Sequence, residues 1–301
     1  MASQSEDRDA GGACFRRVTV LGPGLLGGSI LLALRERRLV RETALWARRP
    51  EAVDRARECG FADCCTTDLA RAIAGSDLVV LCTPIGAMPA LAAQLAPALA
   101  DDAIVTDVGS VKEPVVRELG SALGHARFVG GHPMAGSEQA GIEAARADLF
   151  AGAVCIVTPD PTTPPAVSDR VARFWSSLGG VVRTLDPATH DRVIAEASHL
   201  PHLVAAVLVN YVCGTTPDPL QFAGNGFRDT TRVASGPAAM WREILSYNRG
   251  HVREAITGMI SSLQQARQLL ETPDDGRLEA LLASAKQRRD EMGHGRGHGG
   301  A

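Results

Sequence analysis

The sequence has little excess charge of either sign, and its cysteines do not form the pairs that bind metal or build a disulfide framework. The net charge is −3 at pH 7, so no bulk electrostatic attraction to nucleic acid or to an anionic membrane is expected. The seven cysteines include no C-x-x-C pair and are odd in number, which indicates buried thiols in a reducing cytoplasm. We therefore expect a cytoplasmic protein with no metal site and with neither nucleic acid nor a membrane as partner.

The sequence also shows no apolar targeting segment. Residues 1–13 are polar and acidic, unlike a signal peptide, and like the Gly- and His-rich residues 293–301 they are expected to be disordered. Residues 78–100 carry no charge, but three prolines and Gly86 interrupt them. A buried strand, a turn and an apolar helix explain this stretch better than a membrane span does. With 45% hydrophobic and 22% charged residues, the composition is that of a packed globular protein.

Residues 14–186 alternate short apolar runs with amphipathic stretches. Seven runs read as strands: RRVTVLG, TALWAR, DLVVLCTP, AIVTDVG, RFVGGHP, AVCIVTP and GVVRTLD. Stretches with helical spacing lie between them, among them residues 30–38, 112–123 and 166–177. Apolar strands that alternate with helices of this length predict an α/β fold, a Rossmann domain built on a doubly wound parallel sheet.

After Pro187 the β pattern ends. Four helices are expected in the remainder, at residues 188–213, 238–246, 250–271 and 277–292. The proline follows Asp186, a residue suited to cap a helix N-terminus, so we place a domain boundary at Asp186–Pro187. Residues 187–292 are then an all-helical domain. Its first helix is apolar on more than one face, so we expect a homodimer partner to cover it.

The first apolar run leads into a glycine-rich loop, GPGLLGGS, and then into a helix. Gly22 permits a tight turn, Gly24 lets the backbone approach a pyrophosphate, and Gly27 lets the helix pack closely on the strand. A glycine turn without a ligand is the alternative, but the position on the first β-α unit of a long α/β run favours a dinucleotide site. The residues predicted to bind a nicotinamide dinucleotide are Gly22, Gly24, Leu25, Leu26 and Gly27.

The end of the second apolar run bears on which dinucleotide is bound. An NAD site usually carries an acidic residue about 20 positions after the glycines, where this sequence has Ala47 followed by Arg48 and Arg49. Two guanidinium groups suit a ribose 2′-phosphate, so NADP is favoured over NAD. The alternative is that both arginines belong to a solvated loop and that either cofactor is used.

Three later segments place polar residues at the ends of expected strands or helices. They are TDVGSVK at residues 106–112, GGHPMAGSE at residues 130–138 and SHLPH at residues 198–202. The carboxyl ends of the strands are where ligands bind to an open α/β sheet. His132 ends a strand among Gly, Pro and Ala residues, which is too tight a setting for a solvated histidine. This favours a catalytic role for His132 over a structural one.

With these motifs in this order, the sequence resembles the prephenate/arogenate dehydrogenases of tyrosine biosynthesis. The likeness covers about residues 15–290 and includes GFRDTTRVASGPAAMW at residues 226–241. Its most specific part is GGHPMAGSE joined to SHLPH, since the glycine loop alone is common. The resemblance implies oxidative decarboxylation of prephenate, arogenate or both, with hydride transfer to NAD(P), and a helical domain that forms a homodimer.

The resemblance also implies roles for individual residues. His132 would be the catalytic histidine, Ser110 its hydrogen-bonding neighbour, and Thr83 and Pro84 would lie on the nicotinamide side. Arg232 would bind a carboxylate of the substrate. The full set on the substrate side is Ser198, His202, Arg232, Glu138 and Trp241, the last two near the pocket entrance.

Two other functions stay open from the sequence. A different dehydrogenase of the hydroxyacid superfamily would use a catalytic lysine on the helical domain, where this sequence has only Lys286 near the chain end. A dinucleotide-binding sensor without catalysis would have no need for His132, Ser110 and Arg232 together. Prephenate and arogenate share the reacting ring, so the sequence does not decide between these two substrates.

Overall fold

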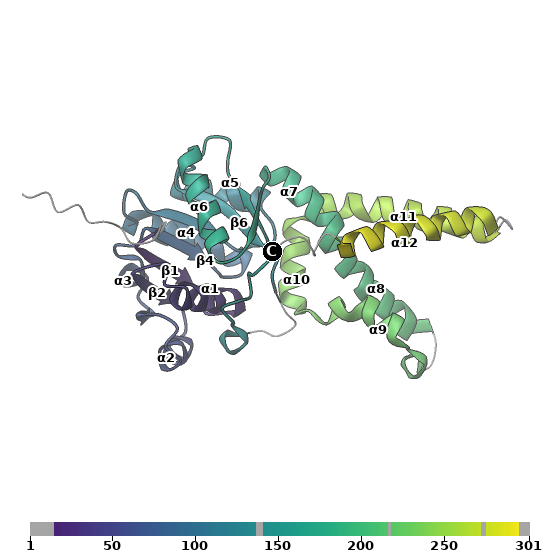
Figure 1. Cartoon of the computed structure of the whole chain (residues 1–301), viewed down its shortest axis with the longest axis horizontal. Coiled ribbons are helices and arrows are strands. Elements are labelled where there is room, and N and C mark those ends of the chain that lie inside the picture. Colours follow the sequence, from purple (N-terminus) through teal and green to yellow (C-terminus); the bar gives the residue numbers. More distant parts are fainter. Residues whose placement is uncertain (1–14, 137–140, 216–217, 272–274, 295–301) are drawn as a thin grey trace, which may run out of the picture. The chain divides into compact units, whose positions relative to one another are not determined.

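The computed structural model describes residues 15–136, 141–215, 218–271 and 275–294 (Figure 1). The chain divides into two compact units, residues 1–249 and 250–301. The first unit holds the sheet, the helices that cover it and the helices up to α10. The boundary predicted at Asp186–Pro187 lies inside this unit and stays a prediction.

An eight-stranded sheet forms the centre of the first unit, with the strand order β3-β2-β1-β4-β5-β6-β7-β8. All seven predicted runs form strands. The bounds are β1 Arg17–Leu21, β2 Glu42–Trp46, β3 Cys64–Thr66, β4 Leu78–Leu81, β5 Ile104–Asp107, β6 Phe128–Pro133, β7 Val154–Thr158 and β8 Val181–Thr184. Strand β3 was not predicted, because its three residues are too few to display an alternating pattern.

One strand pair departs from the parallel pattern. From β3 through β6 all neighbours are parallel, but β7 runs antiparallel to β6, and β8 is again parallel to β7. An antiparallel neighbour needs no crossover helix. The described part of the connection from β6 to β7 contains only the short 3-10 helix η3 (Ile142–Ala144), whereas α6 (Pro165–Ser177) lies between β7 and β8. The predicted Rossmann architecture is confirmed, with this difference at one edge.

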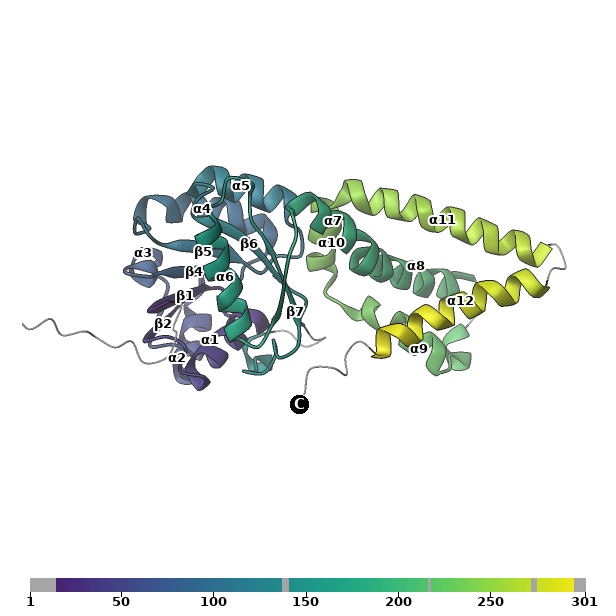
Figure 2. The ribbon, with the colours of Figure 1, turned by 45° about the horizontal axis from the view of Figure 1, so that its top comes forward.

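Helices cover both faces of the sheet (Figures 1 and 2). One apolar core joins the first face to α1 (Leu25–Glu36), α2 (Pro50–Glu58) and α6. A second core joins the opposite face to α3 (Leu69–Ile73), α4 (Met88–Leu95) and α5 (Glu113–Leu123). Neighbouring residues of a strand point to opposite faces, so β4 contributes to both cores. Helix α1 begins at Leu25, ahead of the predicted start at residue 30, so the glycine loop leads directly into its N-terminus.

The helical part of the first unit begins with one long stretch in three segments, α7 (Pro187–Ile194), the π-helical turn η4 (Ala195–His199) and α8 (Leu200–Thr215). A single helix over residues 188–213 was predicted. Pro201 explains the difference, because it has no N–H for the carbonyl four residues earlier and its ring crowds that carbonyl. The stretch is followed by α9 (Asn225–Thr231), which was not predicted, the 3-10 helix η6 (Arg232–Ser235) and α10 (Ala238–Tyr247).

The second unit is built from α11 (Arg249–Glu271) and α12 (Asp275–His294), close to the predicted ranges. Large apolar side chains of these helices are exposed in the single chain, including Leu263 at 59% and Leu270 at 72%. Helix α12 reaches two residues into the tail that was expected to be disordered. The rest of that tail, residues 295–301, and residues 1–13 lie outside the described part of the chain.

One helical stretch, Pro187–Thr215, is long and apolar enough to cross a membrane by length and composition. Core helices of soluble proteins pass the same test, so this is weak evidence for a membrane span. The stretch also carries buried polar residues, which mark it as part of a polar site. The uncharged residues 78–100 form β4, the 3-10 helix η1 (Ile85–Ala87), α4 and a second 3-10 turn, in agreement with the expected strand, turn and helix.

Candidate active site

The glycine loop after β1 has the geometry of a dinucleotide site. Gly22 adopts a φ of +118°, and a Cβ there would lie 2.6 Å from the Cys82 carbonyl oxygen. A Cβ at Gly27 would lie 2.1 Å from the Gly22 carbonyl oxygen, so close packing requires both glycines. A Cβ at Gly24 would meet nothing within 4 Å. The loop is thus packed at two glycines and open at the third, which leaves the N-terminus of α1 accessible to an anion.

The neighbouring strand ends complete this crevice. Ala47, directly after β2, is buried, whereas Arg48 and Arg49 are exposed. None of these three residues carries a carboxylate at the strand end. After β4, the hydroxyl oxygen of Thr83 is buried and lacks a hydrogen-bond partner within the described chain, and Pro84 is exposed. An open glycine, two exposed guanidinium groups and an unsatisfied hydroxyl fit a dinucleotide with phosphate and carboxamide groups.

His132 lies near the carboxyl end of β6 and is only 6% exposed. Its Nδ1 atom is 2.9 Å from Nε2 of His190 in α7, with the ring planes at 63°. Burial, and then the neighbouring His190, Lys112 and His199, hold the pKa of His132 well below its usual range. The imidazole is therefore neutral near pH 7 and able to accept a proton.

His190 is in turn bonded to a carboxylate. Its Nδ1 atom is 2.7 Å from Oδ1 of Asp191, and both residues are buried. The same carboxylate accepts hydrogen bonds from the backbone N–H groups of Lys112 (2.7 Å) and Glu113 (2.9 Å) at the start of α5. Asp191 therefore attaches α7 to the N-terminus of α5, where a carboxylate is favoured by the helix dipole. Burial lowers the pKa of His190 more than Asp191 raises it.

A buried ion pair lies behind His132. The ammonium group of Lys112 is bonded to Oδ2 of Asp107 and donates to the carbonyl of Gly131 at 2.7 Å. The Asp107 carboxylate also accepts from the backbone N–H of Gly131 at 3.0 Å and of Gly109 at 2.8 Å. A Cβ at Gly131 would lie 2.5 Å from the Asp107 carbonyl oxygen, which explains why the strand residue before His132 is glycine.

The SHLPH segment forms the other side of the site. His202 stacks on Trp241 of α10, with ring centroids 3.5 Å apart and planes at 9°. His199 is fully buried at the π turn, where Asn248 Nδ2 lies 3.1 Å from its Nδ1 atom, and burial lowers its pKa to about 4. Asn248 also donates to the Asp191 carbonyl at 2.8 Å. Among the described residues, no group of three or more His, Cys, Asp or Glu is arranged to hold a metal ion.

The structure brings several predicted residues together and leaves others at its margin. His132, His202 and Trp241 belong to the polar cluster described above. Ser110 is half-buried in the loop between β5 and α5, and Ser198 is half-buried in the π turn. Arg232 is exposed at the start of η6, which packs on α8. Glu138 lies outside the described residues.

The sequence did not predict His190, Asp191 and Asn248. The first two lie in the helix expected at residues 188–213, where a His-Asp pair reads as an ordinary polar turn. Burial is what distinguishes these two residues from an ordinary surface pair, and it results from the packing of α7 on α5, which the sequence does not display. Asn248 lies between two expected helices and carried no motif.

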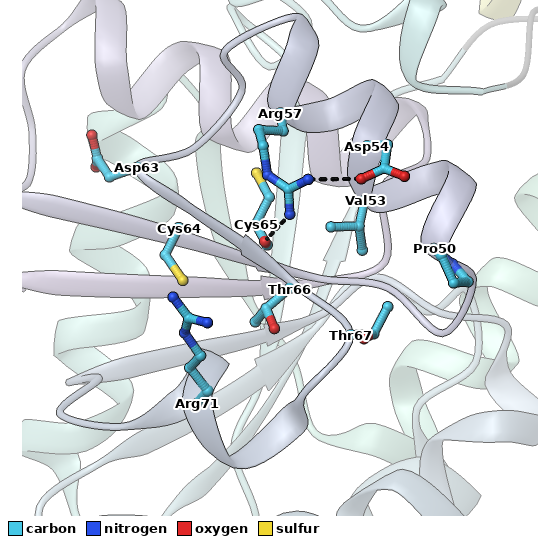
Figure 3. A pocket seen from close by; sticks show the side chains of 10 residues that line it. All are labelled: Pro50, Val53, Asp54, Arg57, Asp63, Cys64, Cys65, Thr66, Thr67 and Arg71. Atoms are coloured by element: carbon cyan, nitrogen blue, oxygen red, sulfur yellow. Dashed lines mark hydrogen bonds and ion pairs between the residues drawn. The ribbon is translucent and has the colours of Figure 1, made fainter.

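A separate pocket of about 360 Å³ lies between α2, β3 and α3 (Figure 3). None of the candidate site residues that the structure describes lines it. Arg57, on its wall, is already bonded to Asp54 (2.7 Å) and to the Cys65 carbonyl oxygen (3.0 Å). The pocket is therefore not part of the polar cluster around His132.

Known families match both parts of the chain. The model of the prephenate dehydrogenase nucleotide-binding domain matches residues 30–184, and that of the prephenate dehydrogenase dimerization domain matches residues 186–284. The cyclohexadienyl dehydrogenase of Zymomonas mobilis is 34% identical, over 91% of this chain and 95% of its own length. The prephenate dehydrogenase of Bacillus subtilis is 31% identical, over 91% of this chain and 75% of its own length.

Solved structures agree with the sequence matches. Prephenate dehydrogenase from A. aeolicus, in complex with hydroxyphenyl propionate and NAD+, is 34% identical with a TM-score of 0.87, and the match covers 92% of this chain and 98% of that one. Synechocystis arogenate dehydrogenase is 30% identical with a TM-score of 0.80, covering 92% and 99%. The chain therefore belongs to the prephenate/arogenate dehydrogenase family, the oxidoreductases that carry out oxidative decarboxylation in tyrosine biosynthesis.

Proposed function

We propose that His132 is the base that removes the ring hydroxyl proton of prephenate, arogenate or both. The observation that carries this is a neutral, buried histidine near the carboxyl end of β6, where the ligands of an open α/β sheet bind. A base must be unprotonated at the working pH, and the lowered pKa of His132 meets this requirement.

Beyond this base, the reaction requires few further groups from the protein. As the hydroxyl O–H bond breaks, the proton goes to His132. A bound nicotinamide would supply the acceptor for the hydride that leaves the carbon bearing this hydroxyl. The resulting ketone is conjugated with the two ring double bonds, which end beside the ring carbon that carries a carboxylate, so loss of CO2 from that carbon makes the ring aromatic and is strongly downhill. The remaining residues therefore bind the substrate, orient it and keep water away.

On the substrate side we assign Arg232 to a carboxylate of the dianionic substrate. A protein of net charge −3 needs local cations for such a ligand, and a guanidinium binds a carboxylate through two hydrogen bonds. His202, fixed by its stacking on Trp241, and Ser198 at the π turn are assigned to the same ligand. Ser110 is assigned as the neighbour of His132, and Glu138 stays a sequence-based assignment at the entrance.

For the cofactor we favour NADP over NAD. Ala47 carries no carboxylate to accept the ribose 2′-hydroxyl, and the exposed Arg48 and Arg49 directly follow β2. The loop residues Gly22, Gly24, Leu25, Leu26 and Gly27 would hold the pyrophosphate, with Thr83 and Pro84 on the nicotinamide side. The related A. aeolicus enzyme was crystallised with NAD+, so use of both cofactors is the competing proposal.

We also propose a homodimer in the cytoplasm. Apolar side chains are exposed on α8, where Val207 is 57% and Tyr211 65% exposed, as well as on α11 and α12. The match to a dimerization domain supports a second copy as the covering partner. Light scattering at micromolar concentration tests this. A uniform species of about 63 kDa, twice the chain mass of 31.6 kDa, is expected, and a uniform monomer would contradict it.

Initial rates with prephenate and arogenate, each with NAD and NADP, test the function. With at least one of these substrate–cofactor pairs, the cofactor should be reduced, CO2 released and 4-hydroxyphenylpyruvate or tyrosine formed. His132→Asn should bind the cofactor but turn over slowly. No cofactor reduction with any of the four pairs would overturn the proposal and favour a dinucleotide-binding sensor.

A further inference from the structure

We propose that Asp191 and His190 are positioning residues that hold His132 as its Nδ1–H tautomer, so that the Nε2 atom of His132 is the base. The inference rests on the proposed function, because it assigns the reacting atom of the histidine that the reaction uses. Neither residue was among the predicted site residues.

Asp191, as a carboxylate, can only accept hydrogen bonds. Its two oxygens already accept from the backbone N–H groups of Lys112 and Glu113, and Oδ1 lies 2.7 Å from Nδ1 of His190. A contact of this length between an acceptor and a ring nitrogen requires the hydrogen on the nitrogen. His190 therefore carries a hydrogen on Nδ1.

His190 is fully buried, and burial lowers its pKa, so near pH 7 it carries one ring hydrogen. That hydrogen is on Nδ1, which leaves Nε2 as an acceptor. Nε2 of His190 lies 2.9 Å from Nδ1 of His132, so the hydrogen between them belongs to His132. A neutral His132 with its hydrogen on Nδ1 presents a lone pair at Nε2, and this atom is left to face the substrate.

The other charged and titratable groups around the pair do not disturb this assignment. The ammonium of Lys112 is bonded to Asp107 and to the Gly131 carbonyl, and Nδ1 of His199 is bonded to Asn248. When the hydroxyl O–H bond breaks, a new N–H bond forms at Nε2 of His132. The positive charge on that ring is then stabilised through His190 by the anionic Asp191 beyond it.

Two substitutions of His190 separate positioning from simple packing. In His190→Gln the longer side chain places its amide oxygen close to the former Nε2 position, where it accepts from His132. In His190→Asn the amide nitrogen takes the place of Nδ1 and keeps the contact with Asp191. This shorter side chain does not reach the former Nε2 position, so His132 is left without an acceptor. We expect His190→Asn to lower kcat by about 10²–10⁴-fold, and His190→Gln to keep at least roughly tenfold more activity than His190→Asn. KM should change little, because His190 is fully buried.

The opposite order, with His190→Asn as active as His190→Gln or more so, would overturn the proposal, since it would mean that only the contact with Asp191 matters. Melting temperatures of both variants check that they are folded. The matched control is His125→Asn, which should leave kcat unchanged. His125 precedes the amino end of β6, opposite His132, and its side chain is 39% exposed beside Asp160.

A second measurement needs neither turnover nor a His190 variant. In the full-length protein labelled with 15N-histidine, the ring nitrogens of His132 are assigned by comparison with His132→Asn. Near pH 7 we expect a protonated Nδ1 and an unprotonated Nε2, and a hydrogen on Nε2 would refute the proposal. If no substrate pair is oxidised but His132 has the expected tautomer, the proposed function fails while the assignment of the hydrogen bonds stands.

Discussion

Replacing Lys112 by methionine probes the ion pair behind His132, the proposed base. Both Lys112 and Asp107 have side chains with no solvent exposure, and the ammonium group is bonded to the Asp107 carboxylate and to the Gly131 carbonyl. Methionine has a similar length and volume but neither charge nor donor. The substitution therefore removes the electrostatic partner while it leaves little cavity, and the Asp107 carboxylate is buried without a cation.

Breaking a buried pair by removing one partner typically costs about 3–5 kcal/mol. Asp107 keeps the N–H groups of Gly109 and Gly131, so we expect Lys112→Met near the lower end of that range. Against a total stability of about 5–15 kcal/mol, this is a large fraction. Replacing both partners, in Lys112→Met/Asp107→Asn, removes the unpaired charge, but the Asn amide can accept from only one of the N–H groups of Gly109 and Gly131, so the double variant should recover part of the lost stability.

Urea unfolding followed by circular dichroism measures these differences. All variants are compared at one protein concentration, since the apparent stability of the proposed dimer would depend on it. If Lys112→Met lies within about 1 kcal/mol of wild type, the ion pair contributes little and the reasoning is wrong. A double variant less stable than the single one would refute it as well.

Four further outcomes follow from the site. His132→Asn should lower kcat by about 10²–10⁴-fold with cofactor affinity unchanged, which stopped-flow turnover and a cofactor titration measure. Because burial and neighbouring charge hold the pKa of His132 well below the ordinary histidine value of about 6.5, kcat/KM should be lost only well below that pH, and in Lys112→Met this loss should begin at a higher pH. Arg232→Ala should raise KM by about 10- to 100-fold with kcat nearly unchanged, whereas an unchanged KM with a lower melting temperature would mean a structural arginine. Kinetics with both cofactors should show NADP preferred by about 10- to 100-fold, less so at high salt and in Arg48→Ala or Arg49→Ala, and a wild type that prefers NAD would end this interpretation.

Sequence patterns predicted those features of the fold that depend on a few neighbouring residues. The apolar runs predicted seven of the eight strands, because a buried parallel strand reads as a short continuous apolar segment. The glycine loop was readable because Gly22 needs a positive φ and Gly27 has no room for a Cβ, and both constraints act over a few residues. The tight setting of His132 near the end of β6 was recognisable for the same reason.

The features that the sequence left open depend on contacts between distant segments. The antiparallel pairing of β7 depends on the path of the chain after β6, which no residue pattern in β7 encodes. Likewise, the sequence predicted one helix over residues 188–213, and it indicated neither the π turn nor the side chains that this turn buries.

The hydrogen-bond partner of His132 is the clearest case. His132 and His190 are 58 positions apart, and their bond forms because the Asp191 carboxylate binds the N-terminus of α5 and fixes α7 there. Sequence periodicity reports which face of a helix is apolar, but not which polar side chain a neighbouring element will enclose. The sequence by itself therefore determined the fold class and the dinucleotide loop and singled out His132 as the candidate base, while the hydrogen bonds that orient this histidine were decided by tertiary packing.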